Sequence, residues 1–270
     1  MTEVASLGVS SFQSIRDLFF SESGIWLKDS KRLLVQQRLR PRLEALALPS
    51  FDAYCRRLVE GDSQEKRLVV DLLTTHETYF FREPNHFNEL AMEVRERFKD
   101  RPIRGWSAAC ASGEEPYSIA MTLLDVRPCG DWVVCGTDIA HCSLQKAEMG
   151  IYPLTRVDAF PPDYLRRFAQ RGTGEFDGSF RVKEEVRRKV QYSFHNLLSS
   201  PMNAHSYDVV FARNVLIYFD KVRMDKVLDN LLHALRPGGL IFFGHGDCLG
   251  EHELPIRKVH RSVYEYTGDC

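Results

Sequence analysis

Two adjacent carboxylates, Glu114 and Glu115, follow a turn built from small residues. The apolar run 103–109 before the turn has the character of a β-strand, and a helical pattern begins at the two glutamates. In an open α/β sheet, a ligand lies outside the carboxyl ends of the strands, where the first strand-to-helix turn approaches it most closely. Small residues such as Ala108 and Gly113 let the backbone come near that ligand. The segment therefore predicts a turn that binds a nucleoside cofactor.

The charge of this turn distinguishes between cofactors. One glycine replaces the three of a dinucleotide-binding motif, so a pyrophosphate cradle is poorly supported. Two carboxylates in the first helical turn would repel phosphate but would favour an ammonium or sulfonium group. S-adenosylmethionine carries both cations and no phosphate, so it suits the turn better than NAD or ATP. Taken alone, Glu114 and Glu115 are also explained as residues that cap a helix.

Two later strand ends add candidate ligands for the same cofactor. Asp138 ends the predicted strand 132–138, 25 residues after the turn glycine, where an acidic side chain accepts hydrogen bonds from ribose hydroxyls. Asn196 and Leu197 follow the predicted strand 190–194, where an amide side chain and the next backbone amide can read an adenine edge. A solvated aspartate and an ordinary turn asparagine are the competing interpretations.

The elements that must position these residues are of two kinds. Apolar residues recur at helical spacing up to about Phe98, which predicts an N-terminal all-helical domain over residues 1–95 and a polar linker over 96–102. Short apolar runs then alternate with amphipathic stretches, which predicts an α/β domain over 103–270 with an open, mostly parallel sheet. The predicted strands are 103–109, 132–136, 190–194, 207–211 and 240–244, and the predicted helices are 114–125, 141–149 and 221–235.

One segment interrupts this alternation. Residues 171–178 are rich in glycine, and the residues after them alternate between polar and apolar. This pattern is typical of a hairpin. We therefore expect a small antiparallel β-subdomain, inserted at about 171–192, that faces a partner.

Composition excludes several classes of protein. The 36 basic and 37 acidic residues give no global attraction to nucleic acid or to anionic lipid. Seven cysteines without a CxxC pair argue against a disulfide framework and against a zinc knuckle, so no metal is predicted. The chain shows neither a signal-peptide pattern nor an apolar run long enough to cross a membrane. We expect a cytoplasmic protein that does not insert into membranes.

Four sequence blocks in one order carry a resemblance to a known family. They are Thr78–Glu83 (TYFFRE), 106–119 (WSAACASGEEPYSI), 211–220 (FARNVLIYFD) and 235–240 (LRPGGL). On these blocks the chain resembles the CheR family of chemotaxis receptor methyltransferases, from about residue 12 to residue 267. The resemblance implies a Rossmann-like S-adenosylmethionine-dependent methyltransferase fold.

The resemblance also implies a reaction and a set of site residues. In that family, S-adenosylmethionine methylates glutamate side chains on the cytoplasmic helices of a chemoreceptor, leaving glutamate methyl esters and S-adenosylhomocysteine. This sequence departs from the family at His76, where Asn is common, and at Gly246-Asp247, where Ser-Glu is common. The residues expected to bind the cofactor are His76, Thr78, Arg82, Ala108, Glu114, Glu115, Asp138, Asn196, Leu197, Arg213 and Asn214.

Methylation of a carboxylate sets modest chemical demands. A glutamate side chain has a reference pKa of about 4.3, so it is already ionised near neutral pH and needs no strong general base. Catalysis should then come from positioning in a partly desolvated site. Arg82 is expected to orient the incoming carboxylate, and Tyr218 to present its hydroxyl or ring to the transferring methyl group. A packed core aromatic is the competing interpretation of Tyr218.

Two segments are candidate docking sites for a receptor. Residues 28–42 contain six basic residues and one acidic residue, and a helix there would present a cationic face to an acidic receptor helix. The docking residues expected on this face are Lys31, Arg38, Arg40 and Arg42, although an ordinary solvated helix has the same pattern. The 171–192 hairpin offers an edge to which a receptor C-terminal peptide can add a strand.

Other classes of activity remain as alternatives. A small-molecule O-methyltransferase shares the sheet, and a non-catalytic S-adenosylmethionine-binding signalling scaffold would keep the same turn. A nucleic-acid methyltransferase is disfavoured because the residues after the fourth strand, Ala212 to Val215, lack the Asp/Asn-Pro-Pro-Tyr/Phe motif. Arg82 and Tyr218 argue against a scaffold, and the basic N-terminal segment favours a protein substrate.

Overall fold

The computed structural model describes residues 6–98, 101–247, 249 and 253–268. The chain forms two compact units. The first contains the N-terminal residues up to Thr75 together with the short segment 139–141. The second runs from His76 to Asp138 and from Cys142 onward. The predicted linker at 96–102 therefore does not separate the units, because the boundary lies at Thr75/His76.

The first unit is a helical bundle, as the sequence predicts. Its helices are α1 (Val9–Ser23), the 3₁₀ turn η1 (Asp29–Lys31), α2 (Arg32–Ala45), α3 (Phe51–Val59) and α4 (Ser63–Leu73). Local signals set several of their ends: Ser50 accepts a hydrogen bond from the amide of Ala53 at the start of α3, and Asp62 caps α4 in the same way. Their apolar stripes form one core around Ile15, Leu39 and Val69.

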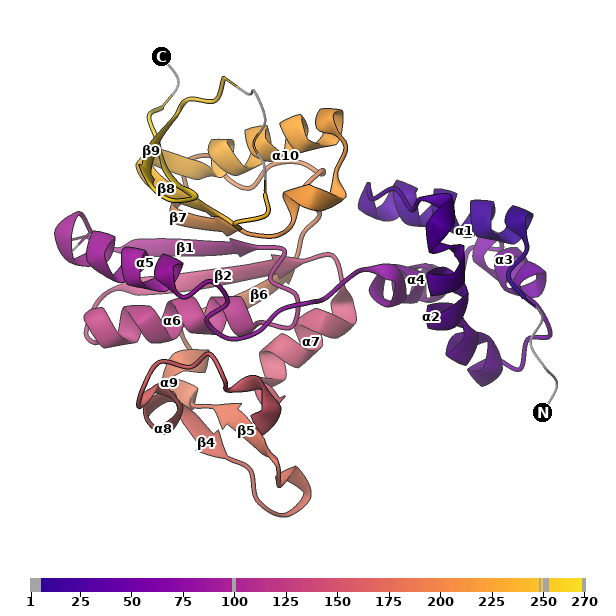
Figure 1. Ribbon diagram of the computed structural model, residues 1–270, viewed down its shortest axis with the longest axis horizontal. Coiled ribbons are helices and arrows are strands. Elements are labelled where there is room, and N and C mark those ends of the chain that lie inside the picture. The colour runs from indigo at the N-terminus through magenta and orange to yellow at the C-terminus, as the bar shows by residue number, and fades with distance from the viewer. Residues whose placement is uncertain (1–5, 99–100, 248, 250–252, 269–270) are drawn as a thin grey trace. The chain divides into compact units, whose positions relative to one another are not determined.

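The second unit is built on a seven-stranded sheet with strand order β6-β2-β1-β7-β8-β10-β9 (Figure 1). The first five strands of this order pair in parallel, and β10 pairs antiparallel with both of its neighbours, β8 and β9. The strands are β1 (Ile103–Ala108), β2 (Trp132–Asp138), β6 (Val190–Phe194), β7 (Tyr207–Ala212), β8 (Leu235–Phe243), β9 (Ile256–His260) and β10 (Val263–Tyr266). The expected open, mostly parallel sheet is confirmed.

Helices cover both faces of this sheet, and each face has its own core. Helices α5 (Asn85–Glu96) and α6 (Glu114–Val126) pack on one face, and α10 (Lys221–Ala234) packs on the other. Within β7, Val209 and Phe211 point into the first core, while Val210 and Ala212 point into the second. A parallel strand that is buried on both faces reads as a nearly continuous apolar run, and 207–211 departs from this pattern only at Asp208.

The inserted subdomain is larger than the predicted hairpin. It is a three-stranded antiparallel sheet of order β3-β5-β4, formed by β3 (Ile151–Pro153), β4 (Ala169–Arg171) and β5 (Ser179–Val182). Its other elements are η2 (Leu154–Arg156), α8 (Tyr164–Phe168), η3 (Gly174–Phe176) and α9 (Glu184–Arg187), and α7 (His141–Met149) precedes it. The expected span of 171–192 is thus wrong at both ends, because β3 joins the small sheet and residues 190–192 belong to β6 in the central sheet.

Three features of the second unit lack a local signal strong enough to predict them. Helix α5 was expected in the helical domain, but Phe87, Leu90 and Val94 bury their side chains in the core of the second unit. Strand β8 begins five positions earlier than predicted, at Leu235. The strands β9 and β10 were not predicted. Among the described residues, no helix has the length and apolar character needed to cross a membrane.

Candidate active site

The turn between β1 and α6 holds its backbone in a left-handed conformation at three places. The φ angle is 60° at Ala109, 47° at Ala111 and 94° at Gly113. A side chain at Gly113 would also clash, because its Cβ would lie 2.6 Å from the Cβ of Ala147 and 2.8 Å from the hydroxyl of Tyr192. Backbone strain of this kind persists only where the surrounding structure enforces it, and it concentrates at functional sites.

A buried ion cluster lies beside this turn and is centred on Arg213, which follows β7. The Arg213 side chain is only 1% exposed. Its Nη1 donates to Glu115 Oε2 at 3.0 Å, and its Nη2 lies 3.2 Å from Glu83 Oε2 and donates to the carbonyl of Arg82. Buried charges are stable only when they are paired in this way. The cluster therefore joins the 76–83 segment to the cofactor turn.

The pKa values of the two carboxylates in the cluster are shifted in opposite directions. Burial raises the pKa of the Glu115 carboxyl, and Arg213 and Ser107 offset this only in part. Burial acts on Glu83 as well, but there the Arg213 guanidinium and the His245 amide hold the pKa below its ordinary value. Glu83 is therefore the firmly ionised partner of Arg213, and Glu115 is the carboxylate that gains most from a further cation.

The adjacent glutamates of the turn face different surroundings. The Glu115 side chain is 13% exposed and accepts a hydrogen bond from Ser107 at 2.7 Å. The Glu114 side chain is 2% exposed, accepts a hydrogen bond from Ser112 at 2.7 Å and lies 3.5 Å from Arg156. The structure thus separates two residues that the sequence treats alike: Glu115 is accessible beside the ion cluster, whereas Glu114 supports the turn from inside.

Asp138 ties the end of β2 to the cofactor turn. Its Oδ2 accepts a hydrogen bond from the amide of Ala111 at 2.8 Å, and its backbone carbonyl accepts one from the amide of His195 at 3.1 Å. Strand β2 lies between β1 and β6 in the sheet, so the ends of all three strands meet at this carboxylate. This is the place in an open α/β sheet where a nucleoside binds.

The residues after β6 form a turn. The Asn196 side-chain oxygen accepts a hydrogen bond from the amide of Leu198 at 2.9 Å, which is the geometry of an Asx-turn. Leu197 is 5% exposed, and its carbonyl accepts a hydrogen bond from Asn230 at 2.8 Å. The Asn196 side-chain oxygen is therefore used within the turn, as the turn interpretation has it, and Leu197 contributes a buried apolar side chain to the core that contains Trp106.

The segment 76–83 forms another wall of the site. Its backbone has positive φ at Phe81 and at Glu83, and the amide of Phe81 donates to the Ser118 hydroxyl in α6 at 3.0 Å. Arg82 is half-buried, and its guanidinium donates to the carbonyl of Glu77 at 2.8 Å. The side chains of His76 and Thr78 are also half-buried.

A second strained turn follows β7. Asn214 has a φ of 56°, and its backbone amide donates to the carboxylate of Asp247 at 2.5 Å. Asp247 also accepts the amide of Gly244, where a Cβ would lie 2.6 Å from the Asn214 side chain. The Asp247 that departs from the family pattern thus fixes the backbone of Asn214. Tyr218 lies just beyond this turn, on η4 (Leu216–Tyr218), and is half-buried.

Several residues of the site are not predicted by the sequence. Glu83 and Asp247 each hold a strained or charged group in place, and Tyr152 and Arg156 reach the cofactor turn from the inserted subdomain. Only Glu83 carried a usable signal, since it ends the TYFFRE block. The other three act through contacts over long sequence separations. Ala108, the remaining expected residue, is buried at the end of β1.

The structure corrects the expected docking face on α2. Arg42 pairs with the buried carboxylate of Glu65 at 2.7 Å, and Arg38 donates to the backbone carbonyls of Leu73 and Thr74 at the end of α4. These two guanidinium groups are used inside the first unit, because Glu65 needs a partner and a helix C-terminus needs donors. The exposed part of the basic segment consists of Lys28, Lys31 and Arg32, and Arg40 lies half-buried 3.9 Å from Glu44.

The residues that meet at the strand ends fit S-adenosylmethionine. Asp138 offers a carboxylate of the kind that binds ribose hydroxyls, and Glu115 offers a second one suited to a cationic group. Leu197 adds an apolar wall. The Arg213 guanidinium is committed to two carboxylates, so it is not presented to a phosphate. This set of side chains suits a cationic nucleoside cofactor better than a nucleotide.

Comparison with known proteins agrees with this geometry. Residues 10–74 match the all-alpha domain of the CheR methyltransferases, and residues 76–264 match their SAM binding domain. The chain is 41% identical to the chemotaxis protein methyltransferase of Salmonella typhimurium over 100% of this chain and 94% of that protein. It is 38% identical to the Escherichia coli chemotaxis protein methyltransferase, over 100% of this chain and 95% of the relative. It is also 41% identical to chemotaxis protein methyltransferase 2 of Pseudomonas aeruginosa, over 94% and 91%.

The boundary between the two matched domains coincides with the boundary between the two structural units at Thr75/His76. The predicted S-adenosylmethionine-dependent methyltransferase fold, with a helical N-terminal domain and a small antiparallel sheet, is confirmed. On this evidence the chain belongs to the CheR methyltransferase family.

Proposed function

We propose that this enzyme transfers a methyl group from S-adenosylmethionine to glutamate side chains of chemotaxis receptors, on the cytoplasmic side of the membrane. The observation that supports this most directly is the full-length match to chemotaxis protein methyltransferases, combined with the acidic site around Glu115 and Asp138. A small-molecule O-methyltransferase has no need for the exposed basic segment of the helical unit. A protein substrate with clustered glutamates, in contrast, can dock on such a basic segment.

The site residues divide the work of this reaction. When bound, S-adenosylmethionine supplies an electrophilic methyl group on its sulfonium. Asp138 is proposed to bind the ribose hydroxyls, and Glu115 to bind the ammonium group of the cofactor. Arg82 then donates to the incoming carboxylate, and Tyr218 borders the transferring methyl group. No residue is required to remove a proton, because the substrate carboxylate is ionised near neutral pH.

The direct test is a labelling experiment. The full chain is incubated with methyl-labelled S-adenosylmethionine and the cytoplasmic fragment of a receptor, and the label on protein is measured before and after mild base. Base-labile label on the fragment, and its loss when the target glutamates are changed to alanine, would support the proposal. Label only on a small molecule would favour the alternative O-methyltransferase. S-adenosylhomocysteine binding without any transfer would favour a signalling scaffold.

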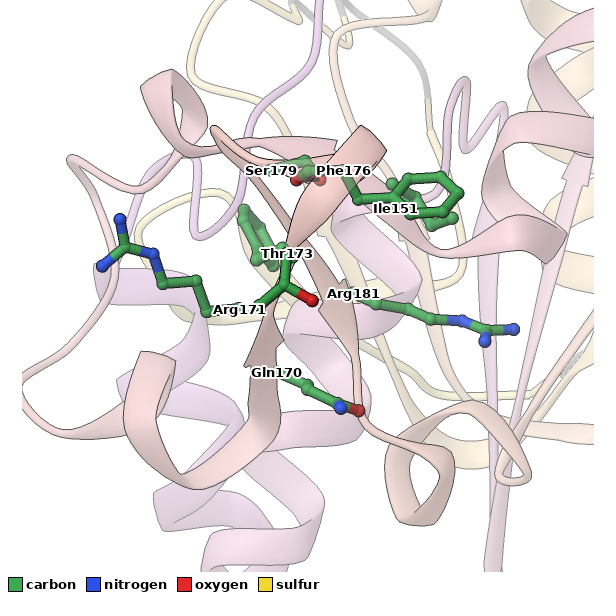
Figure 2. Close-up of a pocket in the computed structure, with 9 residues that line it drawn as sticks. Ile151, Gln170, Arg171, Thr173, Phe176, Ser179 and Arg181 are labelled. Carbon is green, nitrogen blue, oxygen red and sulfur yellow. Dashed lines mark hydrogen bonds between the residues drawn. The ribbon is translucent and has the colours of Figure 1, made fainter.

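A second part of the proposal concerns tethering by the small sheet. A cavity of about 240 Å³ lies against this sheet (Figure 2). It is lined by residues of the three strands, such as Ile151 and Gln170, and by Thr173 and Phe176 of the connection between β4 and β5. Because β5 is the central strand, β3 and β4 are the two edges, and β4 with the turn after it contributes more of the cavity lining than β3 does. A receptor C-terminal peptide is proposed to pair with β4 and to place an apolar side chain beside Phe176.

The charges around this cavity favour an acidic peptide. Arg171 and Arg181 both line it, and Figure 2 shows their side chains extending in opposite directions from the two strands. Calorimetry with receptor tail peptides should detect binding that Arg171→Glu weakens. Arg188→Glu, at the exposed residue that follows α9, is the matched control and should leave binding unchanged. The absence of any heat with the unchanged enzyme would contradict tethering.

A further inference from the structure

The segment that enters the small sheet also contacts the cofactor turn. Tyr152, in β3, donates its hydroxyl to the carbonyl of Ser112 at 2.7 Å. Arg156, at the end of η2, donates to the carbonyl of Thr78 and lies 3.5 Å from Glu114 Oε1. All of these contacts lie within the second unit. Two walls of the cofactor site, the turn and the 76–83 segment, are thus held by the same short stretch of chain.

Burial makes the Arg156 contact important for the turn. The Glu114 side chain is 2% exposed, whereas that of Arg156 is 43% exposed. Burial raises the pKa of the Glu114 carboxyl, and the charges of Arg156 and Lys146 together with the Ser112 hydrogen bond act against this rise. A carboxylate in such a place remains ionised only with help from its neighbours. Among the residues that the structure describes, Arg156 is the cation that lies within ion-pair distance of it.

The Tyr152 contact acts on the neighbouring residue of the same turn. Tyr152 is 4% exposed and packs edge-on against Phe80, with ring centroids 4.9 Å apart. Its hydroxyl therefore has a fixed position from which it holds the Ser112 carbonyl. Ser112 directly precedes Gly113, which is the N-cap residue of α6 and has a φ of 94°. A strained turn keeps its shape only when such contacts determine it.

We propose that Arg156 and Tyr152 are positioning residues for the cofactor. Without touching the reacting atoms, they hold Glu114, Ser112 and Thr78 in the arrangement that S-adenosylmethionine requires. Cofactor affinity is therefore set in part by the inserted small sheet. This role is separate from peptide tethering, because it needs no ligand on the small sheet.

The first test is calorimetric titration of the full chain with S-adenosylhomocysteine. Arg156→Gln should raise the Kd about tenfold, which corresponds to about 1.4 kcal/mol. Tyr152→Phe keeps the packing and should raise the Kd about threefold, since only one hydrogen bond is lost. In steady-state assays, Arg156→Gln should raise the KM for S-adenosylmethionine and leave kcat nearly unchanged. Arg156→Lys, which keeps the charge, should recover part of the affinity.

Arg167 provides a matched control on the same subdomain. Its side chain is 44% exposed, and it forms an ion pair with Asp125 at 2.5 Å, at the opposite end of α6 from Glu114. Arg167→Gln therefore removes an equally exposed contact between the insert and α6, but far from the turn. It should leave the Kd for S-adenosylhomocysteine unchanged. An equal loss of affinity in Arg156→Gln and Arg167→Gln would overturn the proposal, because general destabilisation would then explain both.

A pH profile and a double-mutant cycle separate positioning from simple loss of stability. The charged and titratable groups that act on Glu114 are Arg156, Lys146 and Tyr152. Without Arg156, the Glu114 carboxyl should protonate at higher pH, so the Kd of Arg156→Gln should rise more steeply than that of the unchanged enzyme as pH falls. In a Glu114→Gln background, Arg156→Gln should have a smaller further effect, which comes from its hydrogen bond to the carbonyl of Thr78. Independent, multiplying effects of the two substitutions, or an unchanged Kd in Arg156→Gln, would refute the proposal.

Discussion

Arg213 shows how a single residue can organise the site. Its guanidinium is nearly inaccessible and is shared between Glu83, Glu115 and the carbonyl of Arg82. A lysine would carry its three donors on a single nitrogen, whereas a guanidinium spreads its donors over a planar fork that reaches separate acceptors. Removal of either carboxylate would leave a buried charge without full compensation. The ion pairs of the cluster therefore explain why the positive φ angles of Glu83 and Asn214 are tolerated.

Substitutions of Arg82 and Tyr218 test the catalytic roles proposed for these two side chains. We expect Arg82→Ala and Tyr218→Phe to lower kcat by about tenfold or more while changing the Kd for S-adenosylhomocysteine much less, because both act on the incoming carboxylate or the methyl group. Single-turnover methylation of a receptor fragment, measured beside calorimetry, distinguishes the two effects. Unchanged methylation rates in both variants would remove these residues from the mechanism.

His86 predicts how stability depends on pH. Its side chain is fully buried, and burial, together with the charge of Arg213, lowers its pKa from 6.5 to about 4. The unfolded chain takes up a proton near pH 6.5, but the folded chain resists it. The contribution of His86 to the free energy of unfolding is therefore fully present above about pH 6.5. It should fall by about 3 kcal/mol as the pH is lowered to about 4. Denaturant unfolding between about pH 4 and pH 7 measures this fall in the free energy of unfolding.

His86→Gln is the comparison for that measurement. It removes the titrating ring but keeps a polar side chain of similar size at the same buried position. Its stability at neutral pH should be lower, and its decline between about pH 6.5 and 4 should be shallower than that of the unchanged protein. If the two proteins lose stability in parallel, other groups dominate the acid response.

At the scale of the element, the turn between β1 and α6 depends on its one glycine. Gly113→Ala would combine a positive φ with a Cβ that lies 2.6 Å from Ala147. We expect a loss of about 3 kcal/mol in the free energy of unfolding. S-adenosylhomocysteine binding should weaken as well, because α6 would begin in a different direction. Thermal unfolding with and without the ligand measures both effects.

Gly174→Ala is the control for this prediction. Gly174 also has a positive φ, of 63°, but a Cβ there would meet no described atom within 4 Å. Only the cost of holding an alanine at a positive φ should remain, which is about 1 kcal/mol in the free energy of unfolding. Equal losses at the two glycines would mean that the clash with Ala147 relaxes and that the turn does not demand a glycine for space.

At the scale of the whole molecule, the exposed basic residues of the helical unit predict an effect of salt. Lys31→Glu combined with Arg32→Glu should raise the KM for a receptor fragment about fivefold at low ionic strength, with kcat unchanged, because only encounter with an acidic helix is weakened. The difference should shrink as salt is added. Methylation assays across a series of salt concentrations measure it.

Arg56→Glu combined with Arg67→Glu controls for net charge in this experiment, because it replaces the same number of cations by carboxylates. Arg56 is exposed on α3 and Arg67 on α4, both outside the basic segment that precedes and begins α2. This control should change the KM much less than the substitutions of Lys31 and Arg32 do. Equal effects of the two changes would indicate that overall charge, and not a docking face, controls encounter.

The family and the cofactor were both readable from the chain alone, for reasons of local chemistry. The turn 108–113 with two glutamates after it carries its own composition signal, and helix caps and apolar runs are encoded within a few residues. The alternation of strands and helices after residue 103 therefore predicted five strands of the central sheet. The same local reasoning assigned α5 to the wrong unit, since its amphipathic pattern does not say which core it enters.

Only the tertiary structure decided how these pieces work together. Strand order places β1 between β2 and β7, which brings Arg213 to Glu115 and Asp138 to Ala111 across long stretches of sequence. It also turned Glu114 inward toward Arg156. Spacing along a chain carries no information about which strand ends become neighbours or which charges are buried. The sequence by itself thus determined the cofactor and the family, and the fold determined the partner of each charge, because pairing depends on topology and burial.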